Sequence, residues 1–178
     1  MQKALSASPC SRSALLLGIV ALLVSCGVDT PAHSPPSAPA AIGTVPCGPT
    51  ELFVRHDHAH LTLIFRGQLR DLPARVGITA TTICWLHTHD STGIIHIEAG
   101  DRRALTLGDF FWVWAQPLRT DAVDGEIVAA GESVRVSVNS AVVTTDPGTI
   151  VLGNKDDIVI QIGPPFIEVT PYQWPQGY

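Results

Sequence analysis

The chain has 178 residues, 46% of them hydrophobic, with 16 acidic and 11 basic residues. This length is enough for one ordinary domain with its own buried core. The net charge is −5 and no basic patch with interleaved aromatic residues is present, so nucleic acid is not expected as a partner. A protein partner is neither indicated nor excluded.

The first 25 residues have the pattern of an export signal. Lys3 and Arg12 give a weakly basic start, and an uninterrupted apolar run follows over residues 14–24. This run is shorter than the roughly 20 apolar residues that a transmembrane helix needs, and small residues follow it, as in a secretory signal. We therefore predict a signal peptide over residues 1–25. Its removal would also remove the two basic residues and leave a net charge of −7.

The end of this segment, Leu23-Val24-Ser25-Cys26, resembles the lipobox of bacterial lipoproteins. The resemblance implies cleavage before Cys26 and a diacylglycerol on its sulfur, which would tether the protein to a membrane outside the cytoplasm. Gly27 follows rather than aspartate, and in a Gram-negative cell the sorting rule of that family then favours the outer membrane; otherwise the cell surface is expected. An ordinary secretory signal and an uncleaved anchor are the alternatives.

Residues 26–46 are rich in Pro, Ala and Ser and almost free of charge. Such a composition cannot bury a core and is typical of an extended tether. His33 lies in this segment and is expected to be solvated. The folded part is then a single β-rich domain over residues 47–178.

Two cysteines remain in the predicted domain, Cys47 and Cys84. Thiols outside the cytoplasm are usually oxidised, so a Cys47–Cys84 disulfide is the favoured interpretation. Alternatively Cys84 is a metal ligand, because Cys84-x-x-His87 has a plausible ligand spacing.

The domain sequence predicts strands joined by short turns. Runs of aliphatic and β-branched residues bounded by Gly, Pro, Asn or Asp are typical of strands. Within Ile94–Glu98, period-two alternation puts Ile95 and Ile97 on one face of the strand. The other face carries Ile94, His96 and Glu98. The expected strands are Leu61–Phe65, Leu69–Leu72, Val76–Ile83, Ile94–Glu98, Val134–Val138, Ala141–Thr144, Ile150–Leu152 and Ile158–Ile162.

One short helix is expected over Phe110–Gln116. Thr106 and Asp109 have the spacing of a capping box at its start, and Pro117 ends it. The fold class is therefore α+β, β-rich, with two hairpin-containing halves. The order strand, turn, strand, proline, aliphatic run occurs in residues 60–78 and again in residues 134–152, which suggests a weak internal repeat.

Six of the seven histidines lie between positions 56 and 96. On a strand alternate residues share a face, so the segments His56-x-His58-x-His60 and His87-x-His89 would each present imidazoles on one surface. Neutral imidazoles and carboxylates are ligands of Zn²⁺ and Cu²⁺. The predicted ligands are His87, His89, His96, His58 and His60.

Four further residues are possible ligands or groups that orient the imidazoles: Asp90, Glu98, Asp57 and His56. His56 has a lesser role because the strand can begin after it. Asp90-Ser-Thr-Gly93 is also favourable turn chemistry, so Asp90 can simply cap that turn.

Three segments, HAHLTLIF, WLHTHDSTGIIHIE and TLGDFFWVWAQPL, resemble a group of small, uncharacterised exported prokaryotic proteins. Those proteins share a His-Thr-His-Asp-x-x-Gly-Ile-Ile-His-Ile-Glu core followed by a Thr-Leu-Gly-x-Phe-Phe helix. The resemblance spans about residues 56–165 and implies that the motif and the helix form one unit. It implies no activity.

The leading functional prediction is a lipid-anchored, extracytoplasmic module that binds Zn²⁺ or Cu²⁺ for sequestration, delivery or sensing. The only methionine, Met1, lies in the predicted signal, which argues against methionine-based handling of Cu⁺. The first alternative is a metalloenzyme of the hydrolase type, with an open three-histidine site and Glu98 or Asp90 as general base. The second is an interaction domain without metal, in which the imidazoles point apart or pair with backbone.

Overall fold

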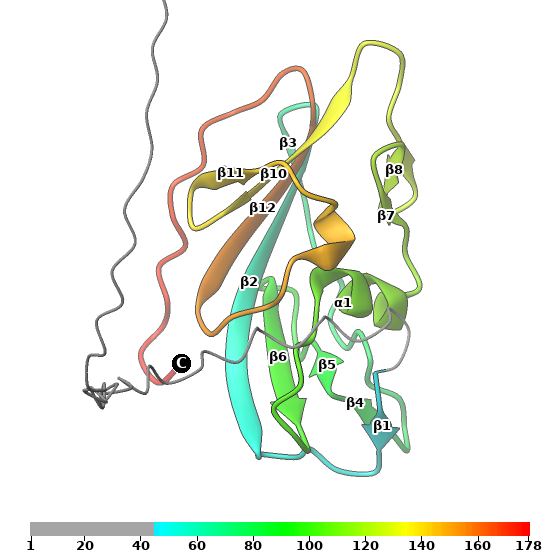
Figure 1. Cartoon of the computed structure of the whole chain (residues 1–178), viewed down its shortest axis with the longest axis vertical. Coiled ribbons are helices and arrows are strands. Elements are labelled where there is room, and N and C mark those ends of the chain that lie inside the picture. Colours follow the sequence, from blue (N-terminus) through cyan, green and yellow to red (C-terminus); the bar gives the residue numbers. More distant parts are fainter. Residues whose placement is uncertain (1–44) are drawn as a thin grey trace, which may run out of the picture. The chain divides into compact units, whose positions relative to one another are not determined.

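The structure is a computed structural model, and it describes residues 45–178 (Figure 1). The predicted signal, the predicted lipidation site Cys26 and all of the predicted tether before residue 45 lie outside the described residues. Within residues 45–178, no helix has the length and apolar character needed to cross a membrane.

The centre of the described part is a seven-stranded sheet (Figure 1). All neighbouring strands in it are antiparallel except β12 and β2, which are parallel. In spatial order the strands are β11 (Ala141–Val143), β10 (Ser133–Val138), β12 (Asp156–Gly163), β2 (Arg55–Phe65), β6 (Ile94–Ala99) and β5 (Leu86–His87), and β3 (Gln68–Arg70) pairs with the end of β2.

Smaller elements surround this sheet. A two-stranded sheet joins β1 (Cys47–Gly48) to β4 (Ile83–Cys84), and a three-stranded sheet contains β7 (Leu118–Arg119), β8 (Ala122–Val123) and β9 (Glu126–Ile127). The helices are α1 (Leu107–Trp114) and the short 3₁₀ helix η1 (Pro147–Thr149). The β-rich α+β class is therefore confirmed. Pairs of two-residue strands carry too little periodicity to be found in a sequence.

Helix α1 begins where the capping box predicts. The Thr106 hydroxyl accepts a hydrogen bond from the backbone N–H of Asp109 at 3.1 Å, and the Asp109 carboxylate accepts one from the backbone N–H of Thr106 at 2.9 Å. The helix thus starts three residues before the expected Phe110. It ends at Trp114, two residues before the expected Gln116, because Ala115 takes a left-handed conformation as its C-cap. Its Phe110 and Phe111 side chains are buried in the main core.

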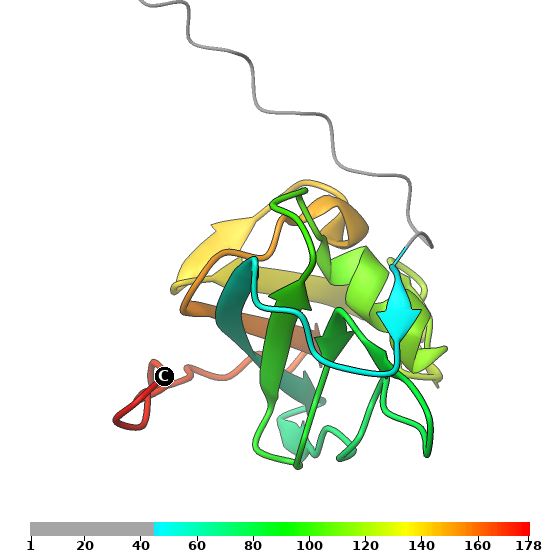
Figure 2. The same ribbon diagram turned by 90° about the horizontal axis from the view of Figure 1, so that it is seen from below.

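The two faces of the central sheet have different roles. Ile95 and Ile97 of β6 and Ala59 of β2 are fully buried in the main core with helix α1, and the alternation within β6 is as predicted. Seen from below, the helix lies to one side of these strands and the C-terminal segment to the other (Figure 2). The second face, which includes the histidines of β2 and β6, is therefore partly covered by the C-terminal segment rather than by a helix.

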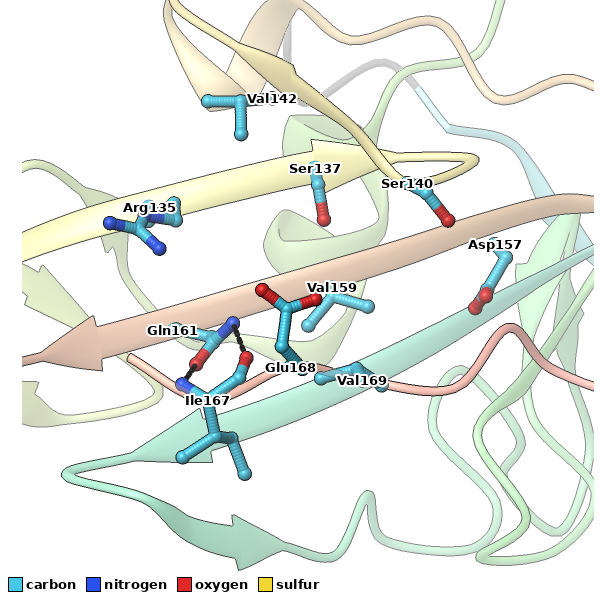
Figure 3. Close-up of a pocket in the computed structure, with 10 residues that line it drawn as sticks. All are labelled: Arg135, Ser137, Ser140, Val142, Asp157, Val159, Gln161, Ile167, Glu168 and Val169. Carbon is cyan, nitrogen blue, oxygen red and sulfur yellow. Dashed lines mark hydrogen bonds between the residues drawn. The ribbon is translucent and has the colours of Figure 1, made fainter. Parts of the chain in front are cut away.

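The C-terminal segment is bound to β12 by side-chain hydrogen bonds. The Gln161 amide accepts from the backbone N–H of Ile167 at 2.9 Å and donates to the carbonyl of Ile167 at 3.0 Å (Figure 3). Further along, the Asp157 carboxylate accepts from the backbone N–H of Tyr172 at 2.9 Å. These contacts bring the last aromatic residues of the chain to the histidine-bearing face.

Two of the expected strands, Val76–Ile83 and Ile150–Leu152, are not formed as continuous strands. Residues 76–83 form a tight loop closed by one bridge between Ile78 and Ile83. The Thr79 hydroxyl accepts hydrogen bonds from the backbone N–H groups of Thr81 and Thr82, and such local bonds compete with strand pairing. Residues 150–152 likewise make only a single bridge, between Thr106 and Val151.

Both halves contain a hairpin, but their third strands pair differently. In the first half β2 pairs with β3 and β6 along the same edge, away from β12. In the second half β10 has β11 on one edge and β12 on the other. The similar order of sequence features therefore does not produce the same strand pairing in the two halves.

Candidate metal centre

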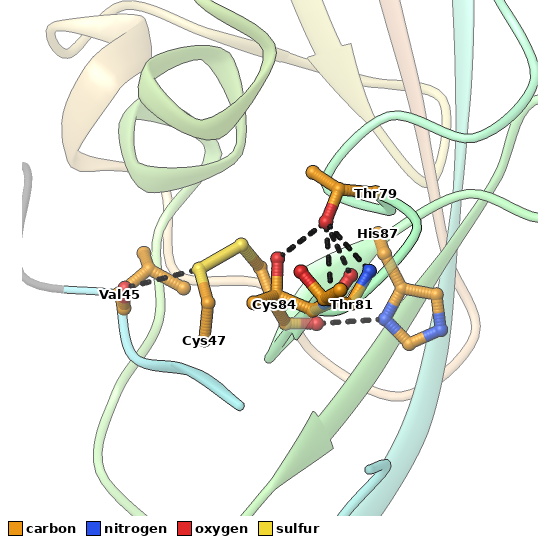
Figure 4. Close-up of a disulfide and its surroundings, with 7 residues drawn as sticks. Val45, Cys47, Thr79, Thr81, Cys84 and His87 are labelled. Carbon is orange, nitrogen blue, oxygen red and sulfur yellow. Dashed lines mark hydrogen bonds between the residues drawn. A yellow bond between two sulfur atoms is a disulfide. The ribbon is translucent and has the colours of Figure 1, made fainter. Parts of the chain in front are cut away.

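The predicted disulfide between Cys47 and Cys84 is present, with an S–S distance of 1.96 Å (Figure 4). The two cysteines are also opposite each other in the β1–β4 pair. The sulfur of Cys84 is therefore not a free thiolate ligand. Its carbonyl oxygen instead accepts a hydrogen bond of 2.9 Å from Nδ1 of His87 (Figure 4).

Three adjacent strands bring three histidines into one row. His87 of β5 is directly opposite His96 of β6, and His96 is directly opposite His58 of β2. Directly opposed residues on one face have Cβ atoms about 4.5–5.5 Å apart, so their side chains are in contact. The ring centroids are 5.2 Å apart for His87 and His96, and 4.7 Å for His58 and His96.

A second row lies next to the first. Since β2 and β6 are antiparallel, moving two residues along both strands brings His56 opposite Glu98. His56 is thus part of β2, contrary to the expectation that the strand begins after it. His89 follows β5 by two residues and approaches His96, with ring centroids 4.5 Å apart. The cluster therefore consists of His56, His58, His87, His89, His96 and Glu98.

The backbone contact of His87 determines which of its nitrogens can bind a cation. A carbonyl oxygen can only accept, so Nδ1 of His87 carries the proton that it donates to Cys84. Nε2 then keeps its lone pair and lies 3.3 Å from Nε2 of His89. Two imidazole nitrogens bound to one tetrahedral Zn²⁺ ion at 2.0–2.1 Å are about 3.3–3.4 Å apart, which matches this separation.

Glu98 is the buried acid of the cluster, with 4% of its surface exposed. Its Oε1 is 3.3 Å from Nδ1 of His96 and 3.4 Å from Nε2 of His56. Its Oε2 has no hydrogen-bond partner among the described residues and is 3.9 Å from Nε2 of His87. An unsatisfied buried acceptor costs about 1–3 kcal/mol, and more when charged, so this oxygen is suited to a cation.

Burial also favours the neutral form of three imidazoles of the cluster, those of His58, His87 and His96. It is the main reason why the pKa of His87 falls to about 4, and together with the neighbouring histidines it lowers the pKa of His96 to about 3. Burial likewise lowers the pKa of His58 and raises the pKa of Glu98. Neutral imidazole is the form that binds metal, so these histidines are in the binding form near neutral pH.

The donor atoms form two groups of metal-binding dimensions. One contains His87, His89, His96 and Glu98, and the other contains His56, His58, His96 and Glu98. Within each group the donor atoms are no more than 4.8 Å from one another. Four atoms so close together all lie within about 2.9 Å of a common point, so side-chain shifts of roughly 1 Å give metal–ligand distances of about 2.0–2.2 Å. These groups, each with one exposed histidine, could hold a metal ion.

Three of the predicted site residues lie outside both groups. His60 is hydrogen-bonded through Nδ1 to Asp157 at 3.1 Å and through Nε2 to the carbonyl of Thr92 at 3.2 Å. Asp57 is on the opposite face of β2 and forms an ion pair with Arg55. The Asp90 carboxylate caps its own turn by accepting from the backbone and hydroxyl of Thr92.

Two residues beside the cluster were not predicted from the sequence. Glu51 Oε1 lies 3.6 Å from Nε2 of His89, and the ring of Tyr178 is 4.8 Å from that of His58. Both come from segments without regular strand or helix, so neither has a spacing that could indicate its position. Tyr172, which stacks on His60 with ring centroids 3.6 Å apart, arrives with the same C-terminal segment.

Gly93 allows the turn before β6 to approach β2. Its φ is +89°, and a Cβ at this position would lie 2.7 Å from the carbonyl oxygen of Leu61 and 2.9 Å from Nε2 of His60. We expect Gly93→Ala to lower the free energy of unfolding by about 1–3 kcal/mol, measured by urea unfolding. Gly131→Ala is the control, since Gly131 has φ +86° but open space around its Cβ position. Equal losses in the two variants would show that the close approach is unimportant.

No protein-family model, curated protein or solved structure matches this chain.

Proposed function

We propose that this protein is an extracytoplasmic metal-binding module that holds one divalent transition-metal ion, Zn²⁺ or Cu²⁺, at His87, His89, His96 and Glu98. The observation that carries the proposal is the buried Oε2 of Glu98, which faces Nε2 of His87 and has no hydrogen-bond partner among the described residues. A cation placed between Oε2 of Glu98, Nε2 of His87 and Nε2 of His89 would bind the carboxylate oxygen and the lone pairs of both imidazole nitrogens.

The donor set supports this choice of metal. Imidazole nitrogens and a carboxylate suit Zn²⁺ and Cu²⁺, whereas Cu⁺ favours thiolates and thioethers. Cys47 and Cys84 are joined in the disulfide, and the only methionine is Met1. The hydrogen bond from His87 to the carbonyl of Cys84 is of the kind that orients metal-binding histidines in known sites.

Three features support a location outside the cytoplasm. The lipobox-like Leu23–Cys26 would place a lipid on Cys26, the disulfide is the usual state of paired thiols in oxidising compartments, and the histidine motif resembles that of exported proteins. The lipid would tether the domain to a membrane through the segment that precedes residue 47. There it would sequester, deliver or sense its metal ion.

The metal-binding module fits the cluster better than the two alternatives. An interaction domain without metal would have its imidazoles directed apart or each paired with backbone. Nδ1 of His87 does pair with the carbonyl of Cys84, but its Nε2 converges with Nε2 of His89. A hydrolase would need a free general base, but Asp90 is engaged by Thr92. Glu98 cannot be a ligand and a free base at the same time.

Metal analysis tests the proposal. We expect the protein, purified without a histidine tag and stripped with a chelator, to bind Zn²⁺ or Cu²⁺ and to melt at a higher temperature. A ligand at about 1,000 times its Kd stabilises the folded state by about 4 kcal/mol.

His87→Ala/His89→Ala should weaken binding by at least about 100-fold. His33→Ala, in the predicted tether, is the control and should bind normally. Absence of binding and of any thermal shift in the wild type would refute the proposal.

A further inference from the structure

We infer that the cluster holds a second metal ion, bound by His56 and His58 and bridged to the first ion by the carboxylate of Glu98. This inference rests on the proposed function and extends it from one ion to a pair. It is carried by the number of donors, by the position of the two carboxylate oxygens and by the environment of His58.

The cluster has more donors than one ion uses. Zn²⁺ takes four ligands in most protein sites, whereas five imidazoles and one carboxylate converge here. The two groups share only His96 and Glu98. The remaining donors are divided by strand, because His56 and His58 belong to β2 whereas His87 and His89 belong to β5 and the turn after it. Each side of the shared pair therefore has two imidazoles of its own.

The carboxylate of Glu98 is placed between the two sides. Its Oε1 is 3.4 Å from Nε2 of His56 on the β2 side. Its Oε2 is 3.9 Å from Nε2 of His87 on the β5 side. A carboxylate that binds a different ion through each oxygen is a common bridge in two-metal sites, where the ions are about 3.5–4 Å apart.

His58 gives a second, independent indication. Its side chain is buried, with 8% of the residue exposed, and its ring makes no hydrogen bond within residues 45–178. Its ring neighbours are the imidazoles of His56 and His96 and the ring of Tyr178, at centroid distances of 4.9, 4.7 and 4.8 Å. Since no hydrogen bond within residues 45–178 engages its ring nitrogens, the unprotonated nitrogen keeps its lone pair available. A metal ion shared with Oε1 of Glu98 would use this lone pair.

The first test is the number of ions bound by the chelator-stripped full chain, titrated with Zn²⁺ and measured by calorimetry and by metal content after desalting. All proteins carry His33→Ala, so that the predicted tether adds no donor. We expect two equivalents for this parent protein and one for its His56→Ala/His58→Ala variant. One equivalent in the parent protein would overturn the second ion and leave the proposed function intact, whereas no binding would overturn both. Two equivalents retained in the variant would refute the assignment to His56 and His58.

The second test needs no variant of the cluster. Two Cu²⁺ ions that share a carboxylate are magnetically coupled, so the electron paramagnetic resonance signal should not double when the second equivalent is added. We expect the intensity per copper to fall between one and two equivalents. A signal that grows in proportion to added Cu²⁺ up to two equivalents would show two isolated ions and contradict the bridge.

Discussion

Glu98→Gln should weaken metal binding by roughly 100-fold and, in the metal-free protein, raise the free energy of unfolding by about 1–3 kcal/mol. The carboxylate is buried and its Oε2 has no hydrogen-bond partner among the described residues. The amide removes the buried charge, and its N–H can donate to the lone pair on Nε2 of His87. Functional sites often gain stability when their costly polar group is removed. Urea unfolding in a chelator and metal titration measure the two effects.

The charge-matched control for this prediction is Glu168→Gln. Glu168 is exposed and lines the groove between the C-terminal segment and β12 (Figure 3), and no residue of the cluster lines this groove. The Glu168→Gln substitution should change neither the free energy of metal binding nor that of unfolding by more than about 0.5 kcal/mol. If Glu98→Gln instead destabilised the metal-free protein and bound metal normally, Glu98 would be a structural acid and not a ligand.

Cys47→Ser/Cys84→Ser should lower the free energy of unfolding by about 4 kcal/mol on the chain-entropy model of disulfides. The two cysteines are 37 positions apart, and the segment between them contains β2, β3 and two members of the cluster, His56 and His58. Freeing this loop gives the unfolded chain many more conformations. Thermal and urea unfolding measure the loss, with the reduced wild-type protein as a second comparison.

The same variant should also weaken metal binding. Cys84 supplies the carbonyl that orients His87, and Trp85 next to it accepts a backbone hydrogen bond from Glu98 at 2.9 Å. Serine keeps this carbonyl, but without the disulfide the segment that carries it is no longer anchored to β1. Weakening of such an orienting contact typically costs about 10–100-fold in metal affinity. An unfolding free energy within about 1 kcal/mol of the wild type and an unchanged affinity would mean that strand pairing alone holds this edge.

Among the strands that carry the site, β6 was predictable because the sheet has one apolar and one polar face, whereas the two-residue β5 lies outside every expected strand. In β6 the alternation of Ile95 and Ile97 with His96 and Glu98 predicts both the strand and its polar face, and the structure confirms them. The Thr106 capping box predicts the start of helix α1 with similar success. Local periodicity and local capping are readable from sequence because each involves residues only a few positions apart.

The arrangement of the donors could not be predicted in full, because it depends on strand register between distant segments. The row of His87, His96 and His58 exists only because β5, β6 and β2 are neighbours in that register. His60 has the same spacing as His58, but parallel pairing with β12 puts Asp157 next to it. It therefore has a local partner rather than a place in the cluster. No periodicity within β2 distinguishes these two histidines.

The central claim is that a metal ion binds among His87, His89 and Glu98, and an anomalous-difference map of metal-loaded crystals, recorded at the Zn or Cu absorption edge, tests it most directly. The account predicts a peak within about 2.0–2.2 Å of Nε2 of His87, Nε2 of His89 and Oε2 of Glu98. Peaks only at other sites, or no peak from crystals grown in excess metal, would contradict it.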